Sequence, residues 1–260
     1  MDQMRAAPTR NSEYPWDAFD PLDYLVHNYS RLRADDEEIL ALTQAWFAEH
    51  AGRPGAVNGA AAVNGSGAHG IDVGCGPNLY PGLAMLPLCR SVTLVDYSHS
   101  NIAWLRSHLA HCGEIWRPYW ERISPQDCRG GFEQARGWLA ERGRIQHGSV
   151  FDLPAQTWDL GTMFFVAESI TADYAEFDRA VSRFLRALRP GAPFAAAFME
   201  YSQGYEIAGV PFPAVGVGAT ELRACLADRA TEVRIHRIPT GAQPLRRGYS
   251  GMLLALGITT

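Results

Sequence analysis

Two glycines that directly follow a short apolar run mark a place where this chain could bind a nucleotide-like ligand. In GIDVGCGPNLY (residues 70–80), Gly74 and Gly76 follow a run typical of a buried strand. A side chain at either position would keep the backbone away from the ligand. Asp96 ends a second apolar run, SVTLVD, about twenty positions later, where a carboxylate accepts hydrogen bonds from ribose hydroxyls. The spacing fits both a nicotinamide dinucleotide and an adenosyl cofactor.

Two further positions separate these alternatives. The dinucleotide fingerprint G-x-G-x-x-G requires a third glycine, and this chain has Leu79 there. Asp72, inside the first strand, would repel a pyrophosphate but suits a cationic ammonium group, either directly or through water. S-adenosylmethionine carries an ammonium group and no phosphate. We therefore expect S-adenosylmethionine as the cofactor and S-adenosylhomocysteine as its product.

The elements that must position these residues follow a regular alternation. Apolar runs predict strands over 70–74, 91–96, 144–149, 158–165 and 193–200. Amphipathic segments predict helices over 80–87, 99–112, 130–142 and 173–188. This order predicts βαβ crossovers and a parallel sheet covered on both faces. A helix over 218–228 and two strands over 231–238 and 248–258 follow. With no helix between them, these strands predict an antiparallel hairpin at the edge of a seven-stranded, Rossmann-like α/β sheet.

The chain divides into four segments by composition. The polar composition of residues 1–15 predicts a disordered tail. The pattern over residues 16–50 predicts an N-terminal helical cap or lid. Residues 51–69 consist almost entirely of Gly, Ala, Asn and Ser, which is typical of a flexible loop. Residues 70–260 then form the cofactor-binding domain. Within it, WRPYWER (116–122) supplies either packing for the lid or a tryptophan for the substrate pocket.

Composition narrows the classes of function. The chain has 260 residues, of which 47% are hydrophobic, and a net charge of −5, so it has no overall positive field for nucleic acid. Five cysteines without a CxxC pair indicate reduced thiols. No apolar run reaches the roughly eighteen residues of a membrane span. We expect a cytoplasmic monomer or weak homodimer that acts on a small molecule, with no nucleic acid, membrane or metal partner.

Four motifs together resemble one enzyme family. DVGCGPNLY, VDYSHSN, LRPG and the N-terminal FDPLDYLVHNY resemble the nicotinamide, phenylethanolamine and indolethylamine N-methyltransferases. The acidic strand, the glycine turn and the second-strand Asp are shared by class I S-adenosylmethionine-dependent methyltransferases in general. DYLVHNY and the tyrosine after the glycine turn are more specific to this branch. The resemblance covers roughly residues 16–258, apart from the 51–69 loop, and implies a methyltransferase.

The resemblance also implies how individual residues contact the cofactor. Tyr24 and Tyr29 would lie over its methionine end, and Asp96 would bind its ribose. Where the family has an Asp-Val pair at the adenine, this chain has Ser149 and Val150. The expected cofactor contacts are Tyr24, Tyr29, Asp72, Gly74, Gly76, Tyr80, Asp96, Tyr97, Asn101, Ser149, Val150 and Phe165.

Methyl transfer is an in-line displacement, so the protein chiefly aligns the reactants. A base is needed only when the acceptor must lose a proton. Glu168 and Glu200 follow the fourth and fifth strands, at the edge where chemistry is expected, and with Tyr24 they are the catalytic candidates. We expect methylation of an amine or nitrogen heteroaromatic, such as an indole. Methylation at an indole carbon, O-methylation of a phenol and an inactive cofactor-binding partner protein remain alternatives.

Overall fold

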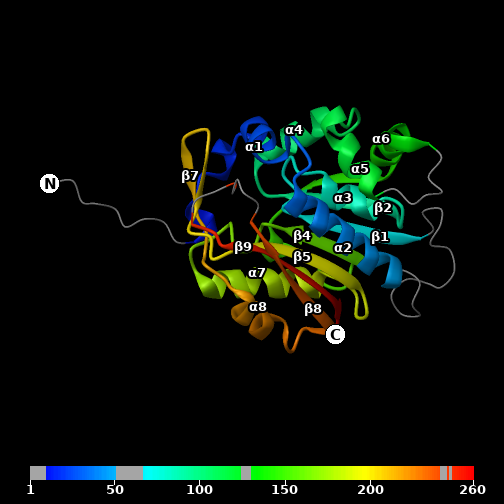
Figure 1. The fold of residues 1–260 in the computed structure, drawn as a ribbon. Helices are drawn as coiled ribbons and strands as arrows, with labels where there is room; N and C mark the ends of the chain where they lie inside the picture. The colour runs from blue at the N-terminus through cyan, green and yellow to red at the C-terminus, as the bar shows by residue number, and fades with distance from the viewer. Residues whose placement is uncertain (1–9, 51–66, 124–129, 241–244, 246–247) are drawn as a thin grey trace.

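The computed structural model describes residues 10–50, 67–123, 130–240, 245 and 248–260. Their main feature is a seven-stranded sheet with the order β3-β2-β1-β4-β5-β9-β8 (Figure 1). Its strands are β1 (Ala68–Val73), β2 (Cys89–Asp96), β3 (Gly143–His147), β4 (Leu160–Phe164), β5 (Pro193–Glu200), β8 (Ala230–Pro239) and β9 (Gly251–Thr259).

The pairing of the strands confirms the α/β prediction. β1 lies at the centre of the five parallel strands and pairs with β2 and β4, while β3 and β5 extend this parallel part on either side. β9 pairs antiparallel with β5 and with β8, so the C-terminal hairpin completes one edge. From β1 the chain continues outward to β2 and β3, and it then crosses to β4 and β5 on the other side of β1. This change of direction places a ligand crevice at the carboxyl ends of β1 and its neighbours.

Helices cover both faces of the sheet (Figure 1). Each face has its own apolar cluster. The first cluster uses α1 to α6, and the second uses α7 and α8. In α7, Phe177, Val181 and Phe184 are buried at helical spacing. The helices are α1 (Pro21–Tyr29), α2 (Ala34–His50), α3 (Tyr80–Met85), α4 (His99–His108), α5 (Arg117–Ile123), α6 (Gly131–Arg142), α7 (Tyr174–Ala187) and α8 (Ala219–Leu226). Short 3-10 turns are η1 (Asn11–Glu13), η2 (Trp16–Ala18), η3 (Glu114–Trp116) and η4 (Val150–Asp152).

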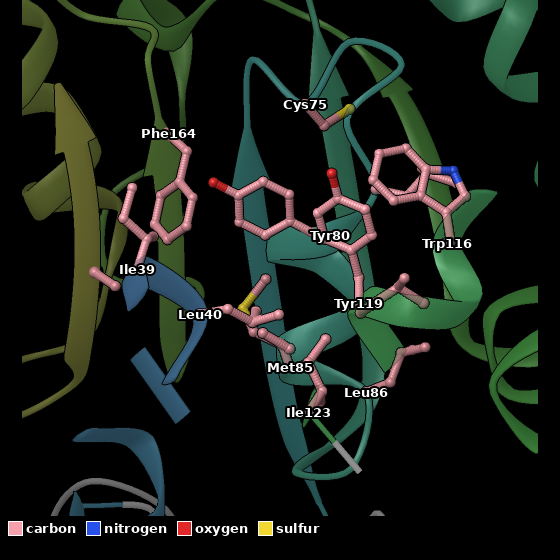
Figure 2. Packing of buried hydrophobic residues seen from close by; sticks show 14 of the residues in the cluster. Ile39, Leu40, Cys75, Tyr80, Met85, Leu86, Trp116, Tyr119, Ile123 and Phe164 are labelled. Atoms are coloured by element: carbon pink, nitrogen blue, oxygen red, sulfur yellow. The ribbon is translucent and has the colours of Figure 1, made fainter. Parts of the chain in front are cut away.

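The stretch WRPYWER forms the end of η3 and most of α5, and its aromatic side chains belong to the core. Figure 2 shows Tyr80 of α3, Tyr119 of α5 and Trp116 close together; the Tyr80 and Tyr119 rings stack with centroids 5.5 Å apart. Trp116 and Trp120 are each 1% exposed. Of the two roles expected for this stretch, the structure supports packing.

The N-terminal segment packs against a small second sheet, β6 (Tyr205–Ile207) and β7 (Val210–Phe212), which the sequence analysis did not predict. The ring of Phe212 stacks on Trp16 at 5.2 Å and on Tyr205 at 5.4 Å. The segment is ordered earlier than expected: residues 10–15 include η1, and the Asn11 amide donates to Glu176 Oε2 of α7 at 2.7 Å. Residues 1–9 and 51–66, where we expected a tail and a loop, lie outside the described residues. None of the described helices is long and apolar enough to cross a membrane.

Candidate active site

A cavity opens at the carboxyl ends of β1, β2 and β4, where the strand order predicts a ligand site. It encloses about 900 Å³, counting the space that is open to solvent. The turn after β1 and the end of β2 form one side. The N-terminal segment contributes Trp16, Phe19 and Tyr24, and β6 contributes Tyr205. Residues far apart in the chain therefore enclose one space.

The glycine turn has a backbone that few other residues could adopt. Gly74 and Gly76 have φ angles of +64° and +50°. A Cβ added to Gly74 would lie 2.6 Å from Cγ2 of Val166, which is too close for any real contact. The amide of Gly74 donates to the carbonyl of Val95 in β2 at 2.7 Å. The turn is therefore held against β2, and its backbone faces the cavity.

Asp96 is buried and accepts three hydrogen bonds from the chain. Its Oδ2 accepts from the Gly76 amide at 2.8 Å, and its Oδ1 accepts from the Ser98 amide at 2.8 Å and from Asn101 Nδ2 at 3.1 Å. Burial raises the pKa of Asp96, and these three donors oppose the rise. Asn101 Oδ1 is buried and has no hydrogen-bond partner among the residues described. Asp96 and Asn101 thus present acceptor oxygens at one wall of the cavity.

Asp72 is also buried, but it accepts fewer hydrogen bonds than Asp96. Its Oδ1 accepts from the Thr162 hydroxyl at 2.8 Å, and its Oδ2 has no hydrogen-bond partner of normal geometry in the part of the chain that the structure describes. Burial raises the pKa of Asp72 to about 8; the hydroxyl of Thr162 and the amide of Gly82 oppose this, whereas the nearby Asp96 adds to it. A buried acceptor without a partner is what a cationic ligand group would satisfy.

The lining also includes the two residues that the resemblance assigns to an adenine. Ser149 and Val150 lie there, and Ser149 Oγ accepts from the Phe151 amide at 3.1 Å as the cap of η4. Tyr97 is 45% exposed at the rim, where its ring lies 6.0 Å from that of His147. Phe165 also lines the cavity, with an unusual φ of +59°. These four residues line the same cavity as Asp72 and Asp96.

Two predicted contacts, Tyr29 and Tyr80, lie behind the cavity wall and do not line it. The hydroxyl of Tyr29 accepts from Asn78 Nδ2 at 3.1 Å, and the hydroxyl of Tyr80 donates to Asp36 Oδ1 at 3.1 Å. Asn78 itself lines the cavity, and its Oδ1 accepts from the amide of Tyr80 at 3.3 Å. Both tyrosines therefore contact a lining residue, which places them one layer away from a ligand.

The two predicted glutamates are likewise absent from the lining. Glu168 is fully buried, and its Oε1 accepts from the Met199 amide at 3.0 Å, which links the end of β4 to β5. Glu200 Oε2 accepts from Arg237 Nε at 2.7 Å and from the Ser250 hydroxyl at 2.5 Å, which links β5 to the C-terminal hairpin. Both carboxylates make contacts that hold strands together. Neither side chain faces the cavity in which a methyl group would be transferred.

Sequence reasoning did not single out Asn11, Phe19, Asn78 and Tyr205 as lining residues. One signal for Tyr205 was present: GYEIAGVPF alternates apolar and other residues around an Ala-Gly pair. Both residues of that pair have positive φ, 48° and 79°, as tight hairpin turns require. Phe19 and Asn78 lie within the motifs FDPLDYLVHNY and DVGCGPNLY but have no role of their own there, and Asn11 carries no pattern. Within the described part of the chain, no cluster of His, Cys, Asp and Glu side chains could hold a metal ion.

Comparison with known proteins places the fold. No known family model matches the chain, and no curated protein matches its sequence. Among solved structures, magnesium protoporphyrin IX methyltransferase (ChlM) from Synechocystis PCC 6803, with bound S-adenosylmethionine, aligns with a TM-score of 0.57 at 13% identity, over 97% of this chain and 99% of its own. The N-methyltransferase NodS from Bradyrhizobium japonicum WM9, in complex with S-adenosylhomocysteine, aligns at 0.53 and 14%, over 92% and 99%.

A third structure is 1,6-didemethyltoxoflavin-N1-methyltransferase from Burkholderia thailandensis, with its substrate and S-adenosylhomocysteine bound; it aligns at 0.52 and 18%, over 92% of this chain and 87% of its own. This chain has the class I methyltransferase fold. The narrower resemblance to the nicotinamide and phenylethanolamine branch stays a prediction.

Proposed function

We propose that this protein is an S-adenosylmethionine-dependent methyltransferase that acts on a small molecule. One observation carries the proposal: Asp72, Gly74, Gly76 and Asp96 meet in one cavity at the carboxyl ends of β1 and β2. The residues there fit the cofactor, because an ammonium group and ribose hydroxyls need buried acceptors. Asp72 Oδ2 and Asn101 Oδ1 are such acceptors, each buried without a hydrogen-bond partner among the residues described.

Each part of the cofactor has candidate partners in the cavity. Asp96 and Asn101 would bind the ribose, and Asp72 would face the ammonium group. The lining residues Tyr97, Ser149, Val150 and Phe165 would enclose the adenine and the adjoining ribose edge. Bound S-adenosylmethionine supplies a methyl group on a sulfonium leaving group, so the chain's own task is alignment and exclusion of water. Tyr29 and Tyr80 would act through Asn78, by fixing the side chain that faces the methionine end.

The acceptor would lie on the side formed by the N-terminal segment. Trp16, Phe19, Tyr24 and Tyr205 line this side. No Lys, Arg or His occurs among the described residues of the lining, so an anionic acceptor would find no counter-ion. Flat aromatic surfaces without cations favour a neutral or cationic ring, which supports an amine or nitrogen heteroaromatic such as an indole. Tyr24 is the candidate for contact with the reacting end, whereas Glu168 and Glu200 lie outside the lining.

Turnover with a labelled methyl donor tests this function. The protein is incubated with methyl-labelled S-adenosylmethionine and separate aromatic acceptors: tryptamine, indole, quinoline, a simple phenol and, as an anionic contrast, indole-3-acetate. We expect label on at least one neutral or cationic nitrogen acceptor and none on indole-3-acetate. Analysis of the product identifies the methylated atom, which decides among N-, C- and O-methylation. Binding of S-adenosylhomocysteine without labelling of any acceptor favours the inactive binding protein.

A further inference from the structure

The two carboxyl groups of the cavity differ in how well the chain supports a negative charge. Asp96 accepts hydrogen bonds from two backbone amides and from Asn101 Nδ2. Asp72 accepts one, from the hydroxyl of Thr162 on the neighbouring strand, and its second oxygen has none of normal geometry from the described residues. Burying an ionised carboxylate without a cation or several donors costs several kcal/mol, so such a group takes up a proton instead.

The elements packed against Asp72 supply no compensating positive charge. β2 brings Asp96, whose charge opposes ionisation of Asp72, and the glycine turn brings the buried Cys75 thiol. β4 brings the hydroxyl of Thr162, and α3 brings the backbone of Gly82. Cys75 also stays neutral, since burial raises the pKa of its thiol further above its ordinary value. Among the described residues that face it, Asp72 therefore meets only neutral groups and one like charge.

We propose that Asp72 is protonated in the free protein at neutral pH and releases this proton when the cationic end of the cofactor binds. The inference rests on the proposed function. The balance is simple: a neutral carboxyl group and an ammonium group become a carboxylate facing an ammonium, and one proton passes to the solvent. An ammonium group supplies the positive charge that the chain does not provide, so ionisation becomes favourable only in the complex. The pKa of about 8 in the free protein agrees with this assignment.

Proton release makes the affinity depend on pH in a defined way. Below about pH 8 the free protein must give up a proton to bind, so the apparent affinity should rise by nearly tenfold for each pH unit between 6 and 7. The rise should flatten as pH approaches 8, where Asp72 is already largely ionised before the ligand arrives. The opposite dependence would be expected if Asp96 or a histidine had to gain a proton on binding.

Isothermal titration calorimetry with S-adenosylhomocysteine tests the inference without any turnover. Titrations at pH 7 in phosphate and in Tris, whose heats of ionisation differ, give the number of protons released. We expect close to one proton per ligand for the wild-type chain, and none for Asp72→Asn, which keeps the Thr162 contact but cannot ionise. Asp36→Asn is the matched control: Asp36 is also buried, with a pKa raised to about 7 by burial, but it lies outside the cavity lining, so release should persist.

The outcomes separate this inference from the proposed function. Binding with equal heats in both buffers and an affinity independent of pH would overturn the inference and leave the function standing. Absence of binding would overturn the function itself. Should Asp72→Asn fail to fold, the infrared difference spectrum of the wild-type chain decides: the carbonyl band of a protonated carboxyl group must disappear when the ligand binds. A spectrum without that loss overturns the inference as well.

Discussion

Asp96 Oδ2 and the amide of Gly76 lie 2.8 Å apart and join the end of β2 to the turn that follows β1. This bond ties together the two features that indicate a cofactor site in the sequence. The carboxylate of Asp96 holds the glycine turn in place before any ligand arrives. The amide of Gly76 stabilises the buried negative charge by donating a hydrogen bond to it. The site is therefore preorganised: the acceptor proposed for the ribose and the backbone that approaches the methionine end are positioned by each other.

Replacing Asp96 should affect the ligand and the turn together. Asp96→Ala removes a charge-assisted acceptor and should weaken S-adenosylhomocysteine binding by roughly 1.5 to 3 kcal/mol. The variant should also unfold at a lower temperature, because the amides of Gly76 and Ser98 lose their partner. Calorimetry and thermal unfolding measure both effects. Asp96→Asn is the control, since it keeps one acceptor oxygen and should lie between the two proteins. Wild-type affinity in Asp96→Ala would mean that the ribose lies elsewhere.

A methyl group on the first glycine of the turn should be strongly unfavourable. Gly74→Ala places Cβ 2.6 Å from Val166 Cγ2 and forces alanine into a φ of +64°. We expect a loss of stability of roughly 1 to 3 kcal/mol, together with loss of cofactor binding. Gly137→Ala in α6 is the control, because a Cβ there meets no other atom and alanine favours a helix. Equal denaturant midpoints for Gly74→Ala and the wild type would contradict the close packing of the turn.

The regular part of the fold was predictable because its pattern is repeated. Each apolar run from β1 to β5 has the length of a strand, so the predicted strand ends lie within two residues of the observed ones. Helix ends were less exact, since the helix predicted over 99–112 ends at His108. That Asp72, Gly74, Gly76 and Asp96 line one cavity could be anticipated for a related reason. Their roles depend on backbone geometry within one βα unit, and that geometry is local.

The cap and the acceptor side were harder to predict, since they depend on contacts between distant segments. Tyr80 follows the glycine turn, yet its hydroxyl donates to Asp36 from α2, which no local pattern reveals. Glu200 ends a strand at the right edge, but Arg237 and Ser250 from the C-terminal hairpin hold its side chain. The position of a residue in a strand predicts where its backbone lies but not which distant group its side chain contacts.

The N-terminal segment and the β6–β7 hairpin should respond to the cofactor as one unit. Phe212 stacks on Trp16, and the Ala208 amide donates to Asp23 Oδ2 at 2.9 Å, so the two segments hold each other over the cavity. Hydrogen exchange should show added protection over residues 16–35 and 205–212 when S-adenosylhomocysteine binds. Phe212→Ala should reduce this gain in both segments, while Tyr174→Ala, at an exposed ring of α7 outside the lining, should not. Protection confined to residues 70–80 would mean that the segment is not a lid.

The protonation of Asp72 should also appear in the stability of the free protein. Its pKa is raised on folding to about 8, so between about pH 4 and pH 8 the folded chain binds more protons at this site than the unfolded chain. The contribution of Asp72 to the free energy of unfolding is therefore highest at low pH and falls as the pH rises through that window. Asp72→Asn removes this loss.

Urea unfolding at pH 5.5 and pH 8 measures this effect. We expect the stability difference between Asp72→Asn and the wild type to shift in favour of the variant by on the order of 2 to 3 kcal/mol from the lower to the higher pH. Comparing the two proteins cancels the slope from other groups, such as Asp36, that titrate in the same range. A difference that does not change with pH would show that Asp72 is ionised in the free protein throughout.

The most direct measurement for the whole account is a thermal-unfolding titration with S-adenosylmethionine, S-adenosylhomocysteine, NAD and NADP. A ligand that binds only the folded chain raises its melting temperature by mass action, in proportion to the logarithm of its concentration above Kd. We predict a rise with S-adenosylhomocysteine and S-adenosylmethionine that keeps growing with the logarithm of ligand concentration and is smaller in Asp96→Ala, and no rise with either dinucleotide. A rise with NAD or NADP and none with S-adenosylhomocysteine would contradict the account, because the cavity would then bind a pyrophosphate beside Asp72.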